Sequence, residues 1–152
     1  MKFKKSIFSA LATLFLVSPV FAELVFPSLS YRTGAYGPNG IPFADGYEDY
    51  FTLMNERDGG IGGEPVRVVK CETAYNTEKG VECYESTKGE GSLAYQPLST
   101  GITYQLIPKA SADNIPILSS GYGRTSAKNG KIFKWVFNFP GTYWDAASIA
   151  TK

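Results

Sequence analysis

Short apolar runs alternate with longer amphipathic stretches along residues 24–151. The short runs are rich in β-branched and aromatic residues, a composition that is typical of buried strands. In the longer stretches apolar residues recur at helical spacing, which predicts helices with one buried face. The expected strands are residues 24–32, interrupted at Pro27, and residues 66–69, 93–96, 115–118 and 132–139.

Start and stop signals predict four helices between and after these strands. A glycine- and proline-rich loop at 33–42 precedes the first helix, whose apolar face carries Tyr47 and Phe51 and which ends at Gly59 and Gly60. The order of strands and helices predicts an α/β fold, a parallel sheet with helices on both faces. The other helices are expected from Asn76 or Thr77 to about Gly89, from Ser99 through Ala110, and from Tyr143 to Thr151.

The first 22 residues have the pattern of a secretory signal peptide. Lys2, Lys4 and Lys5 give a positive start, and the apolar run at 7–17 is too short to span a bilayer. Cleavage after Ala22, a small residue, would leave 130 of the 152 residues, enough for one domain. An uncleaved amphipathic helix is the alternative. The pattern favours export from the cytoplasm.

Charge and composition argue against several classes of function. Loss of the three signal-peptide lysines takes the 15 basic residues to 12 against 14 acidic ones, and no basic block is present. Nucleic acid is therefore not expected as a partner. The chain contains no histidine, which excludes Ser–His and Cys–His catalysis and removes the commonest metal ligand. Neither enzyme activity nor a metal or other cofactor is expected.

The only two cysteines, Cys71 and Cys83, stand twelve positions apart. In an exported chain an even pair at such spacing predicts a disulfide bond, and two buried thiols are the alternative. Closing a loop of this size would stabilise the fold by roughly 2–3 kcal/mol.

The candidate binding site follows from the predicted topology. In an open parallel sheet, ligands bind beyond the carboxyl ends of the strands. After the third strand, Ser99, Thr100 and Gly101 place hydroxyl groups at the opening of a helix, where N–H groups and the helix dipole attract an anion such as a carboxylate. The same groups make an ordinary N-cap, and both interpretations stay open.

Aromatic and polar residues follow the other strands at the same predicted edge. Each aromatic residue alone is typical of a core edge, but several together favour a site lined by apolar and phenolic groups. These candidates are Tyr36 and Asn39 after the first strand, Gly121, Tyr122 and Gly123 after the fourth, and Tyr143 after the fifth.

Two charged residues near this edge have more ordinary interpretations. Arg32 could pair with a ligand anion, but pairing with a neighbouring loop carboxylate is favoured. Glu72 stands where a ribose-binding acid would be in a dinucleotide fold. However, the glycines after the first strand read GxxGxxG, and Pro38 and Pro42 remove N–H groups that a phosphate would need. Nucleotide binding is therefore not expected.

Four segments, in this order behind a signal peptide, carry a resemblance to a known family. They are TGAYGPNG at 33–40, NERDGGIGG at 55–63, PLSTG at 97–101 and IPILS at 115–119. From about Leu24 to its end, the chain resembles the type I periplasmic binding proteins of the leucine/isoleucine/valine class. The resemblance implies one component of an ABC importer, with two lobes around a hinged cleft. Residues 23–140 would form the first lobe, and residues 141–152 would begin the crossover to a second lobe outside this chain.

The resemblance also implies roles for single residues. Ser99 and Thr100 would hold a ligand's carboxylate. Tyr122 and Gly123 stand where the family has small residues and threonine, which favours a larger or flatter ligand than a branched-chain amino acid, such as an aromatic or acyl carboxylate or an amide. Gly121, Tyr122 and Gly123 would complete the pocket for an amino acid or related ligand, Tyr36 and Asn39 would overhang it, and Tyr143 would add a phenol.

The partners expected from this resemblance are a small-molecule ligand and the membrane permease of the importer, and the location is the periplasm. Two alternatives remain, since a fold does not determine function. A ligand-sensing receptor ectodomain would need a membrane span and a signalling domain downstream. An exported flavodoxin-like enzyme would need a nucleophile–base pair or a cofactor loop, and neither is visible in the sequence.

Overall fold

The computed structural model describes residues 23–152 except 121–123 and 140, so the predicted signal peptide lies outside the described residues. In chain order the elements are β1 (Leu24–Ser30), α1 (Gly37–Asp58), β2 (Val66–Glu72), α2 (Thr77–Thr87), the 3₁₀ helix η1 (Lys88–Glu90), α3 (Thr100–Asp113), β3 (Ile117–Ser120), the 3₁₀ helix η2 (Thr125–Lys128), β4 (Val136–Phe139) and α4 (Tyr143–Ala150). None of the helices in the described ranges is long and apolar enough to cross a membrane.

The strands form one parallel array. β1 pairs with β2 along its full length, and β3 pairs with β4 in the same parallel sense. The segment at 92–98 lies between these two pairs: the Leu93 N–H donates to the Val25 carbonyl at 2.9 Å, and the Leu118 N–H donates to the Tyr95 carbonyl at 2.8 Å. The spatial order is therefore β2, β1, segment 92–98, β3 and β4, as in doubly wound α/β folds.

The predicted third strand is not continuous. The Leu93 N–H reaches Val25 of β1, but the next bond of a regular parallel ladder would come from residue 27, and Pro27 has no N–H to donate. Instead, the Tyr95 N–H donates to the Pro116 carbonyl at 2.9 Å, on the side of β3. Two isolated bridges therefore stand where the pattern predicts a strand.

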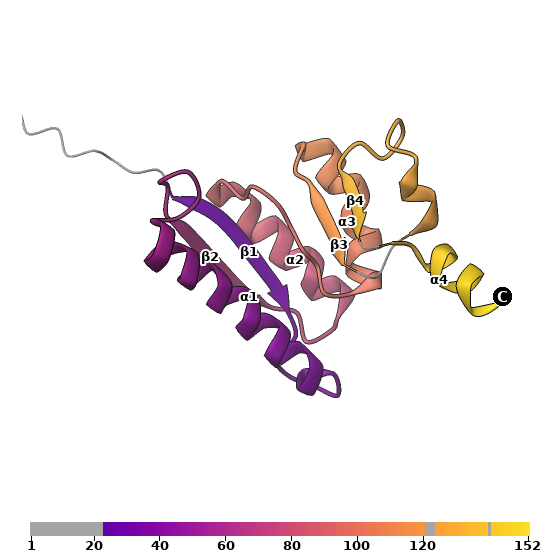
Figure 1. The fold of residues 1–152 in the computed structure, drawn as a ribbon, viewed down its shortest axis with the longest axis horizontal. Coiled ribbons are helices and arrows are strands. Elements are labelled where there is room, and N and C mark those ends of the chain that lie inside the picture. The colour runs from indigo at the N-terminus through magenta and orange to yellow at the C-terminus, as the bar shows by residue number, and fades with distance from the viewer. Residues whose placement is uncertain (1–22, 121–123, 140) are drawn as a thin grey trace, which may run out of the picture.

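Helices cover both faces of the array, as predicted (Figure 1). α1 packs on one face, where Phe51 stacks on Phe26 of β1 with ring centroids 5.0 Å apart. α2 and α3 pack on the other face and enclose the main core. The buried residues of this core are Leu29, Cys83, Tyr84, Tyr95, Ile102, Leu106, Ala110 and Ile117.

The first helix begins at Gly37, earlier than predicted, because it includes glycine and proline residues that are typical of a loop. Pro38 lies in the first turn, where a missing N–H leaves no intrahelical bond unmade, and Pro42 is accommodated inside the helix. Gly40 is required there, since a Cβ at this position would overlap the backbone and ring of Tyr31. Asn39 therefore lies in the first turn of α1 and not in a loop.

The last two strands also differ from the prediction: β3 begins and ends two residues later than predicted, and β4 is shorter. The Ile115 N–H donates to the Ala110 carbonyl at 2.9 Å, so Ile115 belongs to the turn that ends α3. The Phe133 N–H donates to the Asn129 carbonyl at 2.9 Å, which folds the segment before β4 into a turn. These local hydrogen bonds replace pairing with the sheet, so β4 begins only at Val136.

The predicted disulfide is present and joins Cys71 of β2 to Cys83 of α2. Cys83 is buried in the main core. The bond therefore holds α2 against the sheet and closes the β2–α2 connection into a loop. The alternative of two free thiols is wrong.

Removal of this disulfide should lower the free energy of unfolding by about 2–3 kcal/mol, because the unfolded chain regains the freedom of the closed loop. Urea unfolding of the double variant Cys71→Ser/Cys83→Ser and of the reduced wild-type protein should show the same loss. Unchanged stability in both would contradict a stabilising role for the bond.

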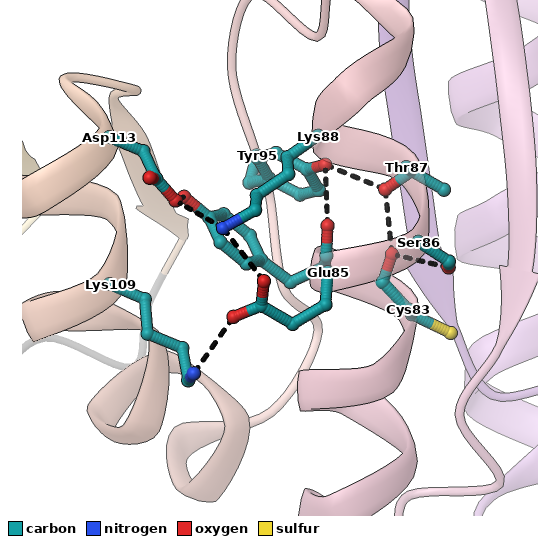
Figure 2. Close-up of polar contacts among 9 residues, drawn as sticks. Cys83, Glu85, Ser86, Thr87, Lys88, Tyr95, Lys109 and Asp113 are labelled. Atoms are coloured by element: carbon teal, nitrogen blue, oxygen red, sulfur yellow. Dashed lines mark hydrogen bonds and ion pairs between the residues drawn. The ribbon is translucent and has the colours of Figure 1, made fainter.

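Ion pairs join the carboxyl-terminal ends of α2 and α3 (Figure 2). Lys88 Nζ lies 2.7 Å from Glu85 and 3.0 Å from Asp113, and Lys109 Nζ lies 2.8 Å from Glu85. Pairing with Lys109 and Lys88 lowers the pKa of the Glu85 carboxyl. This network lies at the opposite end of the helices from the predicted binding edge, and its role is to fasten α2 to α3.

Candidate functional site

The carboxyl ends of the parallel strands bring several loops to one edge of the array. Thr73, just after β2, donates its N–H and its hydroxyl to the Ser30 carbonyl at 2.8 and 3.0 Å, which ties this loop to the end of β1. The first turns of α2 and α3 also meet, since a Cβ at Gly101 would lie 2.9 Å from Thr77 Oγ1. The loop after β2 therefore adjoins the start of α3.

Ser99 and Thr100 stand at the start of α3 and differ in exposure. Ser99 is buried and is the N-cap residue: its Oγ accepts a hydrogen bond from the Ile102 N–H at 3.4 Å. The cap uses only an acceptor lone pair, so the hydroxyl proton is left to donate. Thr100 is half-buried and is the first helical residue, where backbone N–H groups have no intrahelical partner.

Tyr143 is brought to this corner from the other end of the described chain. Its hydroxyl lies 2.7 Å from Thr100 Oγ1, and either oxygen could be the donor. A capping box between Thr142 and Asp145 starts α4 and positions Tyr143 as its first residue. Lys128, at 2.6 Å, and the bonds from Thr142 lower the pKa of the Asp145 carboxyl to about 2, so the box is intact at neutral pH.

A buried hydroxyl lies in β3, on the α3 side of the sheet. Ser119 is fully buried, and its Oγ has no hydrogen-bond partner among the described residues. Side chains alternate along a strand, so Ser119 shares a face with Ile117 of the core and lies closer to the binding edge. Buried polar atoms are nearly always hydrogen-bonded, so the lack of a partner for Ser119 Oγ among the described residues is unusual. The predicted pocket residues Gly121, Tyr122 and Gly123 lie outside the described residues.

Three tyrosines cluster where the chain leaves β1 and β2. Tyr36 is the N-cap residue of α1 and is 50% exposed. Its ring centroid lies 4.3 Å from that of Tyr75, and the Tyr75 centroid lies 4.9 Å from that of the buried Tyr31. Tyr36 is predicted from the sequence as a site residue, but Tyr75, which follows the second strand, carries no recognisable motif and is not predicted.

The two charged residues at this edge are engaged within the protein. Arg32 lies 2.7 Å from Asp45 and 2.9 Å from Glu48, so it pairs with carboxylates as favoured, although these belong to α1. Glu72 accepts hydrogen bonds from the backbone N–H groups of Arg32 and Ala74, at 2.8 and 2.7 Å. Burial alone would raise the pKa of the Glu72 carboxyl, but these bonds lower it overall. Glu72 therefore ties the loops after β1 and β2 together.

An apolar hollow of about 600 Å³ opens elsewhere, on the α1 face of the sheet. Phe43, Tyr47 and Phe51 of α1 line it together with Ala94 and Leu118. Burial raises the pKa of Tyr47 to about 12, so its phenol stays neutral. The lining of the hollow is mainly apolar and aromatic, whereas the start of α3 offers the hydroxyl groups of Ser99 and Thr100. No group of three or more potential metal ligands was found in the described part of the chain.

The fold agrees with the sequence comparison. The chain belongs to the periplasmic binding protein family, whose model matches residues 24–152. The family expected from the four sequence segments is thereby confirmed. No functionally curated protein matches the chain.

Solved structures share the fold over part of their length. A protein described as an ABC transporter permease from the Pseudomonas fluorescens group is 38% identical, with a TM-score of 0.78 over 83% of this chain and 31% of that one. The isoleucine complex of LivJ, a branched-chain amino acid transporter substrate-binding protein from Streptococcus pneumoniae, is 18% identical (TM-score 0.65, 77% and 33%). The benzoate complex of an ABC transporter solute-binding protein from R. palustris is 20% identical (TM-score 0.61, 77% and 32%). The chain thus spans about a third of each of these proteins.

Proposed function

We propose that this chain forms the ligand-binding first lobe of an extracytoplasmic solute-binding protein that delivers its ligand to the permease of an ABC importer. The observation that carries the proposal is the corner at Ser99 and Thr100, placed at the edge where parallel α/β sheets bind ligands. Membership of the periplasmic binding protein family supports it. The signal-peptide pattern before Glu23 supports a periplasmic location.

The ligand of this corner is a small carboxylate, an amino acid or a related amide. The start of α3 offers backbone N–H groups and the positive end of the helix dipole. The hydroxyls of Thr100 and Tyr143 lie 2.7 Å apart, and the hydrogen bond between them uses only one of their two protons. The other proton can be donated to a ligand. These groups favour an anionic or carbonyl oxygen over a cation.

The flatter ligand expected from the sequence is retained as part of the proposal. Tyr36 and Tyr143 are both about half exposed and add aromatic surface to the edge. Proteins of this fold are known with isoleucine and with benzoate, so the fold accommodates aliphatic and aromatic carboxylates. A calorimetric screen in which only leucine, isoleucine or valine bound would overturn this part.

Thr100→Val is expected to weaken carboxylate binding by about 1.5–3 kcal/mol, the range for hydrogen bonds to charged groups. Valine keeps the shape of threonine and removes the hydroxyl that faces Tyr143. The measurement is calorimetric titration of the protein expressed from its natural gene, with benzoate, leucine, isoleucine and valine as probes.

The matched control is Thr52→Val, which removes an exposed hydroxyl that donates to the Glu48 carbonyl along α1. Its affinity should equal that of the wild type. If Thr100→Val retained full affinity, the start of α3 would be an ordinary capped helix and the proposal would fail.

A further inference from the structure

The loop between β2 and α2 has a backbone conformation that its residues do not favour. Ala74 and Tyr75 have φ values of 49° and 58°, in the left-handed region that residues with a Cβ rarely adopt. The Asn76 N–H donates to the Thr73 carbonyl at 2.8 Å and closes a tight turn around them. Glycine or asparagine would occupy both positions with less strain. The backbone conformation of the turn therefore does not explain the presence of a tyrosine at position 75.

Several contacts hold the turn in place. The Ala74 N–H donates to Glu72 Oε1 at 2.7 Å, and Thr73 is bonded to the end of β1. The Cys71–Cys83 bond closes the chain on either side of the turn. Strained backbone persists only where the surroundings over-determine it, and it is concentrated at ligand-binding sites.

The turn presents the Tyr75 ring at the binding edge. The Tyr75 ring meets the Tyr36 ring at 36°, and the Tyr31 ring supports it edge-on at 86°. Tyr31 is 5% exposed, whereas Tyr36 is 50% and Tyr75 38% exposed. We call Tyr36 and Tyr75 the tyrosine wall. A buried ring thus supports two rings that still offer aromatic surface to a ligand.

The tyrosine wall adjoins the anion-binding corner. Tyr75 stands two residues before Thr77, and Thr77 Oγ1 lies against the backbone of Gly101 at the start of α3. We assume that the remaining atoms of a carboxylate held at Thr100 extend toward the wall. Arg32, in the loop after β1, is paired with Asp45 and Glu48 and so does not supply an unpaired positive charge next to the wall.

We propose that Tyr75 is a specificity-determining residue, and that the tyrosine wall selects carboxylates that carry a flat ring over aliphatic carboxylates of the same size. This inference rests on the proposed function, because it assumes that the carboxylate lies at Thr100. The physical basis is the preference of aromatic rings for offset or edge-to-face packing with another ring, which a puckered aliphatic ring cannot reproduce.

The test compares benzoate with cyclohexanecarboxylate, which has the same charge and number of ring carbons but is not flat. Calorimetric titration uses the protein expressed from its natural gene. Wild type should favour benzoate, and Tyr75→Ala should weaken benzoate binding roughly 5- to 10-fold while changing cyclohexanecarboxylate binding much less. Tyr75→Phe should retain the preference. Tyr50→Ala, which removes an exposed tyrosine from α1 away from this edge, should change neither affinity.

The outcomes separate this inference from the proposed function. If Thr100→Val weakens benzoate binding and Tyr75→Ala does not, Tyr75 has no part in selection, although the corner still binds carboxylates. Equal losses for both probes in Tyr75→Ala, or a wild-type preference for cyclohexanecarboxylate over benzoate, would also overturn the inference. If no probe binds, both proposals fail. Should Tyr75→Ala not fold, Tyr75→Leu removes the flat ring with less loss of volume and decides the same question.

Discussion

Tyr95→Ala is expected to lower the free energy of unfolding by about 3–5 kcal/mol, the range for replacing a buried aromatic residue with alanine. The Tyr95 side chain is fully buried and packs on Tyr84 with ring centroids 4.7 Å apart. Its hydroxyl lies 2.6 Å from Thr87 Oγ1 (Figure 2). Burial raises the pKa of the Tyr95 phenol, so the group stays neutral in the core.

Tyr95→Phe is the matched control, because it keeps the ring and removes only the hydroxyl. Thr87 retains its hydrogen bond to the Cys83 carbonyl at 2.7 Å, so the loss should be about 0.5–1.5 kcal/mol. Urea unfolding followed by tryptophan fluorescence measures both variants. Similar losses in the two would mean that the hydroxyl network, and not ring packing, stabilises this part of the core.

Gly40→Ala is expected to lower the free energy of unfolding by about 3 kcal/mol, near the upper end of the usual range for overpacking. The added methyl group would overlap the backbone carbonyl and the ring of Tyr31, and a backbone atom cannot move aside as a flexible side chain can. Relief would require the first turn of α1 to shift away from the end of β1.

Gly46→Ala is the control in the same helix, and its added methyl group meets no atom within 4 Å. Alanine favours the helix over glycine by about 1 kcal/mol, so this variant should be more stable than the wild type. Thermal and urea unfolding should therefore show changes of opposite sign. A stabilising effect of Gly40→Ala would contradict the close approach of α1 to Tyr31.

The alternation of apolar runs predicted the parallel α/β fold because the strands and helix faces obey the ordinary periodicities. The structure departs from the prediction where the backbone of a single proline or glycine determines the local conformation. Pro27 lacks the N–H that would continue the ladder to the third strand. Pro38 and Gly40 read as loop signals, yet the first turn of α1 accommodates the proline, and the approach of Tyr31 requires the glycine.

The candidate site could be predicted only in part. Ser99 and Thr100 follow the end of a strand that the sequence predicts. Tyr143 lies beside Thr100 because the carboxyl end of β4, which precedes it, is at the same edge of the sheet. Tyr75 could not be predicted, since a left-handed turn is normally signalled by glycine or asparagine and here contains alanine and tyrosine. Such a turn is recognisable only from backbone angles.

The covalent ring closed by Cys71 and Cys83 contains Tyr75 and the strained turn. Disulfides form in oxidising compartments and are rare in the cytosol. A copy of this chain that has not left a reducing compartment therefore has an open β2–α2 connection, without the covalent restraint on Tyr75. The covalent restraint on this edge of the protein is therefore acquired only where the two cysteines can be oxidised.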